Sequence, residues 1–135
     1  MEHVDVSWAA IGVAALARFA LGWLWFSPML FYKPWARMSG FTEQTARHGM
    51  GTAIAMWVIA SLLSAFILAH FIHWAHANSA WRGLGIGFHA WLGFTFVALL
   101  DDYAAEKRPF GLFAIKAGNQ LVALLIMGAI LGAWR

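Results

Sequence analysis

The sequence predicts an all-α membrane protein with four transmembrane helices, folded as two antiparallel hairpins with both termini on the same side. The first observation is composition: 62% of the 135 residues are hydrophobic and 11% are charged, whereas about 25% of residues are charged in average soluble domains. The second is length, because four apolar runs each match the about 20 residues that cross a bilayer. The third is that tryptophans stand at the ends of these runs.

The predicted spans are 7–26, 51–74, 81–100 and 110–134. They form one domain, because the chain is too short for two. The first span ends at Ser27-Pro28, since proline interrupts the hydrogen bonds of a helix. Asn78-Ser79 predicts a tight turn, so the second and third spans are expected to be neighbours.

Tryptophan positions support a four-helix arrangement. An antiparallel bundle places the tryptophans at two boundaries, with Trp8, Trp74, Trp81 and Trp134 at one and Trp23, Trp25 and Trp35 at the other. Such belts are typical of membrane–water interfaces. Three or five helices would scatter these side chains.

The segment after the first span alternates aromatic and basic side chains. Phe31, Tyr32 and Trp35 are interleaved with Lys33 and Arg37. This pattern is typical of a short segment that lies in the headgroup region.

Basic residues predict the orientation of the spans. The two longer loops carry Lys33, Arg37, Arg47, Lys107 and Arg108, and the opposite side carries Arg82 and Arg135. Positive charge is enriched on the cytoplasmic side, so we expect a multi-pass protein with both termini outside. Glu2 and Asp5 replace the basic start of a signal peptide, and the first span is therefore expected to be retained.

Composition and motifs argue against several classes of function. Cysteine is absent, which excludes disulfides and thiolate metal sites. The sequence has no soluble domain with a basic patch, so nucleic-acid binding is not predicted. Gly83, Gly85 and Gly87 lie in an apolar helix without a preceding strand, so they do not form a phosphate-binding loop. No catalytic motif is visible, and we do not expect an enzyme.

Arg18 is the most informative single residue, because it lies near the middle of the first span. A central arginine costs about 2.5–3.5 kcal/mol on insertion scales, so it needs hydrogen-bond partners. The candidate partners are polar residues of other spans, namely Ser61, Ser64, Asn119 and Gln120. Arg18 either joins helices internally, contacts an anion or substrate, or binds another protein or a lipid phosphate.

Lys116 begins a second polar group. With Asn119 and Gln120 it occupies one face of the fourth span, at spacings of three and four residues. Asp101 and Asp102 end the third span across a short turn, so we predict that Lys116 pairs with them and joins two helices. A proton or ion relay is the alternative.

Histidines raise the question of a cofactor. His70, His73 and His76 end the second span, and His89 lies in the third at a depth similar to that of His70. Two facing imidazoles suit haem, a pigment or a transition metal. No carboxylate or cysteine completes a zinc site, so hydrogen bonding between helices is the simpler interpretation and we predict no cofactor.

Glycines indicate close helix packing. Two pairs have four-residue spacing, and single glycines occur elsewhere in the spans; the set is Gly22, Gly83, Gly87, Gly93, Gly128 and Gly132. Small residues let helix backbones approach one another. The two pairs pack either against each other within one chain or against a second copy.

The same residues carry a resemblance to a known family. The first part of the signature is Gly22, Trp25-Phe26-Ser27-Pro28, Phe31 and Trp35. The second part is Trp91-Leu92-Gly93-Phe94, Asp102-Tyr103, Arg108-Pro109, Ala117-Gly118 and Met127-Gly128-Ala129-Ile130-Leu131. The chain resembles the bacterial membrane family catalogued as domain of unknown function 1761 (DUF1761), which implies four transmembrane helices and an inner-membrane location. Phe26 replaces an expected tyrosine and Lys116 an expected acidic residue.

Three functions remain open from the sequence. The leading one is a non-enzymatic membrane protein that self-associates or serves as an accessory subunit of a larger membrane complex, with the lipid bilayer and other membrane subunits as its partners. The alternative is a small oligomeric transporter or channel whose path is lined by Arg18 and the Lys116 face. The third is a carrier of haem, pigment or metal through His70 and His89.

Overall fold

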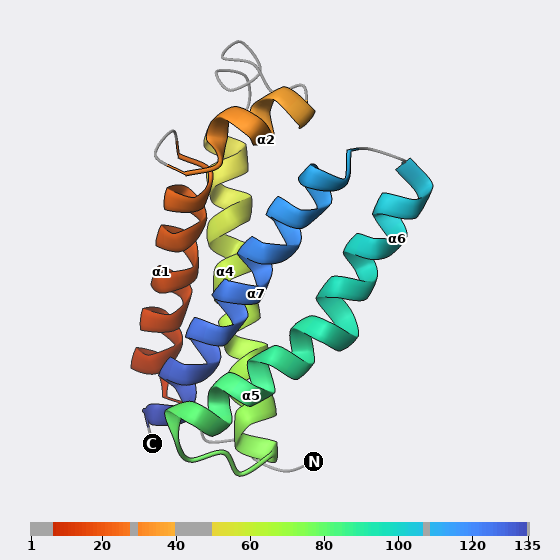
Figure 1. Cartoon of the computed structure of the whole chain (residues 1–135). Helices are drawn as coiled ribbons and strands as arrows, with labels where there is room; N and C mark the ends of the chain where they lie inside the picture. The colour runs from red at the N-terminus through yellow and green to blue at the C-terminus, as the bar shows by residue number, and fades with distance from the viewer. Residues whose placement is uncertain (1–6, 28–29, 40–49, 107–108, 135) are drawn as a thin grey trace.

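The chain folds as a bundle of long helices with one short helix across one end (Figure 1). The computed structural model describes residues 7–27, 30–39, 50–106 and 109–134. Its helices are α1 (Trp8–Trp25), α2 (Tyr32–Ser39), α4 (Met50–Trp74), α5 (Ala80–Ala90), η1 (Trp91–Thr95), α6 (Phe96–Glu106) and α7 (Phe110–Ala133). The described residues include no strand.

Four helical rods are long and apolar enough to cross a membrane, as predicted. They are α1, α4, the continuous rod α5–η1–α6, and α7. Helix α1 begins and α7 ends at the same end of the bundle (Figure 1), which we call the N/C end. We call the opposite end, where α2 lies, the α2 end. The side of the membrane that each end faces stays a prediction.

Helix α1 has clear local signals at both ends. The Ser7 hydroxyl accepts a hydrogen bond from the Ala10 amide at 3.2 Å, which caps the free amides of the first turn. At the other end, the Ser27 hydroxyl donates to the Leu24 carbonyl at 2.6 Å. The helix therefore lies within the predicted span.

The aromatic–basic segment after α1 is helical. Helix α2 lies across the α2 end of the bundle (Figure 1). The rings of Phe26 and Trp35 lie 5.2 Å apart, and Met38 packs close to Gly111 at the start of α7. The segment is thus held against the ends of α1 and α7.

The turn between α4 and α5 is tight and depends on His76. This residue has a φ of 57°, a left-handed conformation that usually takes glycine. The Ala77 amide donates to the Ile72 carbonyl and the His76 amide to the His73 carbonyl, both at 3.1 Å. These two bonds form the Schellman motif that commonly ends a helix. Ser79 then caps α5 by accepting from the Arg82 amide.

The helix of the third span is longer than the predicted apolar run and is irregular in its middle. It continues past residue 100 through Asp101 and Asp102 to Glu106. Alanines and Glu106 are good helix formers, so the helix outlasts the apolar run. In η1, the Phe96 amide donates to the Trp91 carbonyl five residues earlier. Such a π-helical turn inside an α-helix often marks a functional position.

The core lies where α1, α4 and α7 meet near the N/C end. Its members are mainly small or unbranched, and comprise Ala10, Ile11, Ala14, Ala15, Ala65, Leu68, Ala69, Ile72, Ala77, Met127 and Leu131. In lipid the hydrophobic effect does not drive helices together, so van der Waals packing matters more. Alanine side chains are small and let the helices approach closely. Helix α7 is the central element, because 39% of its most apolar 18 residues are buried, against 11% in the third span.

Glycines join α5 to α7 backbone to backbone. A Cβ at Gly83 would lie 2.8 Å from the carbonyl carbon of Gly128, and one at Gly87 would lie 2.9 Å from that of Leu124. Gly132 also faces Gly83. Both glycine pairs therefore pack within one chain, which was the first of the two predicted arrangements.

Gly22 and Gly93 were predicted to pack against other helices, and this prediction is wrong for both. No described atom lies within 4 Å of a Cβ built at either position. Both glycines face away from the helix contacts, because the contacts of α1 and of the third span lie on other faces.

Candidate functional site

Three helices change from apolar to polar side chains at a similar level of the bundle. Counted from the N/C end, the facing stripes read Ile11–Ala14–Arg18 on α1, Leu68–Ala65–Ser61 on α4 and Met127–Ala123–Asn119 on α7. Each stripe follows the spacing of three or four residues that keeps side chains on one helix face. We call Arg18, Ser61 and Asn119 the polar layer.

Arg18 makes a hydrogen bond across the bundle to Ser61. The Arg18 Nη1 donates to the Ser61 Oγ at 2.8 Å, and Ser61 is 1% exposed. This pair was among the predicted contacts of Arg18. Ser64 is half-buried and makes no described bond to Arg18.

Asn119 is buried with an unused donor. The residue is 7% exposed, and its Nδ2 has no hydrogen-bond partner among the described residues. Leaving a buried donor unpaired costs about 1–3 kcal/mol. Asn119 and Gln120 were alternative candidate partners of Arg18, and among the described residues the Arg18 hydrogen bond goes to Ser61 on α4.

Two tryptophans hold α7 next to this layer. The Trp25 Nε1 donates to the Ile115 carbonyl and the Trp91 Nε1 to the Ala117 carbonyl, both at 3.0 Å. The ring of Trp25 lies against Gly118, with its Cζ2 at 3.2 Å from where a Cβ would be. Trp25, the last residue of α1, is therefore turned into the bundle.

Sequence reasoning did not single out Trp91 as a functional residue. The available signal was its position, because it stands within a span while most tryptophans stand at span ends. Together with Trp25 it fixes the α7 backbone from two sides. The polar layer is thus held on a rigid element.

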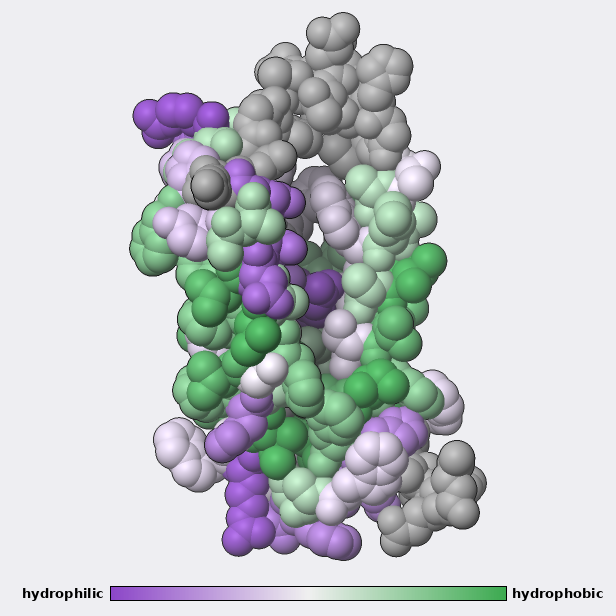
Figure 2. Space-filling view, turned by 90° about the vertical axis from the view of Figure 1, so that its right-hand side faces the viewer, coloured by the Kyte–Doolittle hydropathy of each residue, from purple (hydrophilic) through white to green (hydrophobic). Residues whose placement is uncertain are grey.

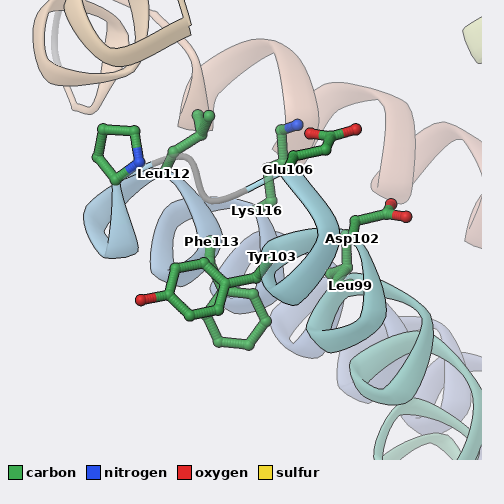
Figure 3. A pocket seen from close by; sticks show the side chains of 8 residues that line it. Leu99, Asp102, Tyr103, Glu106, Leu112, Phe113 and Lys116 are labelled. Carbon is green, nitrogen blue, oxygen red and sulfur yellow. The ribbon is translucent and has the colours of Figure 1, made fainter.

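Lys116 lies in a pocket between α6 and α7 (Figure 3). The pocket is lined by Leu99, Asp102, Tyr103, Glu106, Pro109, Leu112, Phe113 and Lys116. In the view of Figure 3, the ends of the Lys116 and Glu106 side chains lie on one side, and the neighbouring rings of Tyr103 and Phe113 lie on another. Those two rings are 5.4 Å apart.

The predicted ion pair of Lys116 is corrected by this geometry. Among described residues, no ion pair joins Lys116 to Asp101 or Asp102, and Asp101 does not line the pocket. Glu106 does line it and was missed. The signal was its spacing of four residues from Asp102, which places both carboxylates on one face of the helix.

His70 and His89 each hydrogen-bond within their own helix. The Nδ1 of His70 lies 2.8 Å from the Phe66 carbonyl, and that of His89 lies 2.7 Å from the Gly85 carbonyl. Each ring thus bonds to its own helix, four residues back. The described residues contain no group of three or more histidines and acids that could hold a metal. His73 lies on α4, three residues from His70, and His76 serves the turn.

The polar layer combines a cationic side chain, a hydroxyl and a buried amide. It offers a cation and an unpaired amide donor, while the nearest hydroxyl, that of Ser61, is already engaged by Arg18. The pocket at the α2 end offers an ammonium and carboxylates beside aromatic rings.

One comparison with known proteins gives a match. A family model described as protein of unknown function (DUF1761) matches residues 9–132. No curated protein and no solved structure matches significantly. The match includes nearly all of the four helices that are long and apolar enough to span a membrane.

Proposed function

The chain belongs to the DUF1761 family of proteins of unknown function, and from that premise we propose that it is a small non-enzymatic protein of the bacterial inner membrane that self-associates. Four apolar helices support the membrane location. The same surface would serve it as an accessory subunit of a larger membrane complex.

The observation that carries this proposal is an open side between α4 and α6. The α5–η1–α6 rod packs on α7 through α5 and then diverges, so that α6 lies well away from α4 (Figure 1). Figure 2 shows this side as a hollow between the two, with hydrophilic surface at its floor. Helix α6 contributes no residue to the described core.

A lipid chain is a poor cover for such a hollow. Hydrocarbon offers no hydrogen bonds, so polar groups at membrane depth are normally covered by protein or water. A second copy would bring helices with small residues and further donors and acceptors to this side. Self-association would therefore cover the polar hollow with side chains of a second copy of the same chain.

Cysteine cross-linking tests this arrangement directly, because the chain has no native cysteine. Val97→Cys places a thiol at an exposed position of α6, and Leu16→Cys places a matched one at an exposed position of α1. We expect oxidation in native membranes to cross-link Val97→Cys copies and to leave Leu16→Cys monomeric. Mass analysis in mild detergent reports stoichiometry and any other subunit.

A monomeric mass without co-purifying subunits, together with no cross-link at Val97, would contradict the proposal. A foreign subunit in defined stoichiometry would instead support the accessory role. A cross-link at Leu16 alone would move the interface to α1.

Transport is a second candidate, favoured by the placement of two polar groups on one helix. Lys116 in the pocket and Asn119 in the polar layer are three residues apart on α7. Arg18 would line the same path. Ion flux through liposomes containing the purified protein tests this, and flux that is unchanged in Arg18→Leu would remove the assignment.

A further inference from the structure

We propose that the polar layer binds a monovalent oxygen-bearing anion, a carboxylate or a similar oxyanion, between Arg18 and Asn119. The proposal concerns a ligand site within one chain. It holds whether or not the chain self-associates or transports.

The first argument is an excess of donors and positive charge. The Arg18 guanidinium carries five N–H donors, and among described residues its only partner is the Ser61 hydroxyl. The Asn119 Nδ2 adds two buried donors without a described partner. No described carboxylate pairs with Arg18. An anion with two oxygen acceptors supplies what this layer lacks.

The second argument is that Arg18 and Asn119 lie at similar depth. From the Trp25–Ile115 hydrogen bond, Arg18 is seven residues back along α1, or about 10.5 Å, and Asn119 is four residues forward along α7, or about 6 Å. The two helices run in opposite directions (Figure 1), so both steps lead toward the N/C end. The depths differ by about 4.5 Å, less than one helical turn.

The third argument is that both residues lie on the faces that form the core. Arg18 continues the stripe of Ile11 and Ala14, and Asn119 continues that of Met127, while these apolar residues belong to one packed cluster. Both sets of donors therefore stand next to the apolar core. A ligand there is shielded from water, where charge-assisted hydrogen bonds are strong.

The fourth argument is access. The hollow in Figure 2 reaches hydrophilic surface from the side of the bundle, between α4 and α6. Such a lateral opening suits the carboxylate of an amphiphile that resides in the bilayer. It also admits a small free anion once the side is hydrated, so both sources of the same chemistry are tested.

Binding is measured on the purified full-length protein in a non-ionic detergent, through the shift in its unfolding midpoint with ligand concentration. The probes are sodium formate, as a small carboxylate, and laurate, as an amphiphilic one. Dodecanol has the same chain length as laurate without the charge. We expect laurate to raise the unfolding midpoint in a saturable way and dodecanol to have a much smaller effect.

Asn119→Leu is the decisive variant. It replaces the unpaired buried donor with an apolar side chain of similar size, so the variant should fold at least as stably as the wild type without ligand. We expect its Kd for laurate to rise by at least ~10-fold, as the loss of a hydrogen bond to a charged group implies. Arg18→Lys keeps the charge but loses the planar fork, and should weaken binding further.

Arg37→Gln is the matched control, because it removes one positive charge from an exposed position of α2. Its laurate affinity should equal that of the wild type. Stabilisation by formate as well as laurate would show that the anionic group alone suffices, and stabilisation by laurate alone would identify a membrane amphiphile as the source. Equal effects of dodecanol and laurate, no effect of either carboxylate, or wild-type affinity in Asn119→Leu would overturn the proposal.

Discussion

The two halves of the third span meet α7 in opposite ways. In α5, Gly83 and Gly87 bring the backbone of α5 against that of α7. In α6, Phe96 and Tyr103 reach α7 only through their rings, and Phe96 lies 5.8 Å from Phe113 between ring centroids. The same rod therefore begins in direct backbone contact and ends at a distance that leaves a pocket.

This difference shows how side-chain size sets helix separation in a membrane. Without hydrophobic expulsion from water, close packing of small residues is a main source of attraction between helices. Glycine permits that packing in α5, while aromatic and leucine side chains hold α6 away. The tight half anchors the rod, and the open half leaves a pocket beside Lys116.

The largest predicted effect comes from breaking the tight half. Gly83→Leu and Gly128→Leu place a side chain into the facing backbone, so the helices must separate. Overpacking of a core commonly costs about 1–3 kcal/mol, and we expect these variants to reach or exceed that range. Gly85→Leu is the control, because no described atom lies within 4 Å of its Cβ position. Unfolding midpoints in detergent report the difference, and equal midpoints for all three would contradict the backbone contact.

A smaller effect is expected at the boundary between the halves. Trp91→Phe keeps an aromatic ring but removes the hydrogen bond to the Ala117 carbonyl. The loss of one such bond is worth about 0.5–1.5 kcal/mol. The unfolding midpoint should fall by a corresponding amount, whereas Trp81→Phe, at an exposed position, should leave it unchanged. Equal shifts of the unfolding midpoint in the two variants would show that Trp91 does not anchor α7.

A substitution in the turn before the tight half is expected to raise stability. His76 holds a left-handed backbone that glycine adopts without strain. His76→Gly should raise stability by up to about 1 kcal/mol. His76→Val should lower stability, because a β-branched side chain tolerates this conformation poorly. A lower midpoint for the glycine variant would show that the imidazole itself has a structural role.

The smallest effect is expected in the open half. Lys116 makes no described ion pair with Asp101 or Asp102, so Lys116→Gln should change stability by less than about 0.5 kcal/mol. Asp102→Asn should be similarly neutral, and the double variant should be additive. A coupling between the two positions in a double-mutant cycle would show that the ion pair forms in the membrane.

The sequence by itself determined the fold class of this protein. Runs of apolar residues of bilayer length leave a chain little choice but helices, because backbone groups in hydrocarbon must bond within their own segment. The tight turn at Asn78-Ser79 and the break at Ser27-Pro28 then set the hairpins. The position of Arg18 in the first span also indicated an interior polar contact, as one of three alternatives.

Tertiary structure decided which of the marked residues meet. Gly22 and Gly83 look alike in the sequence, yet only Gly83 faces another backbone. Trp23 and Trp25 look alike in the sequence, yet Trp25 bonds to α7 while Trp23 is exposed. The physical reason is rotation: a side chain's face depends on how each helix turns about its own axis when all the helices pack together. That rotation brought Arg18 to Ser61, left Asn119 with an unpaired donor, and opened the side between α4 and α6.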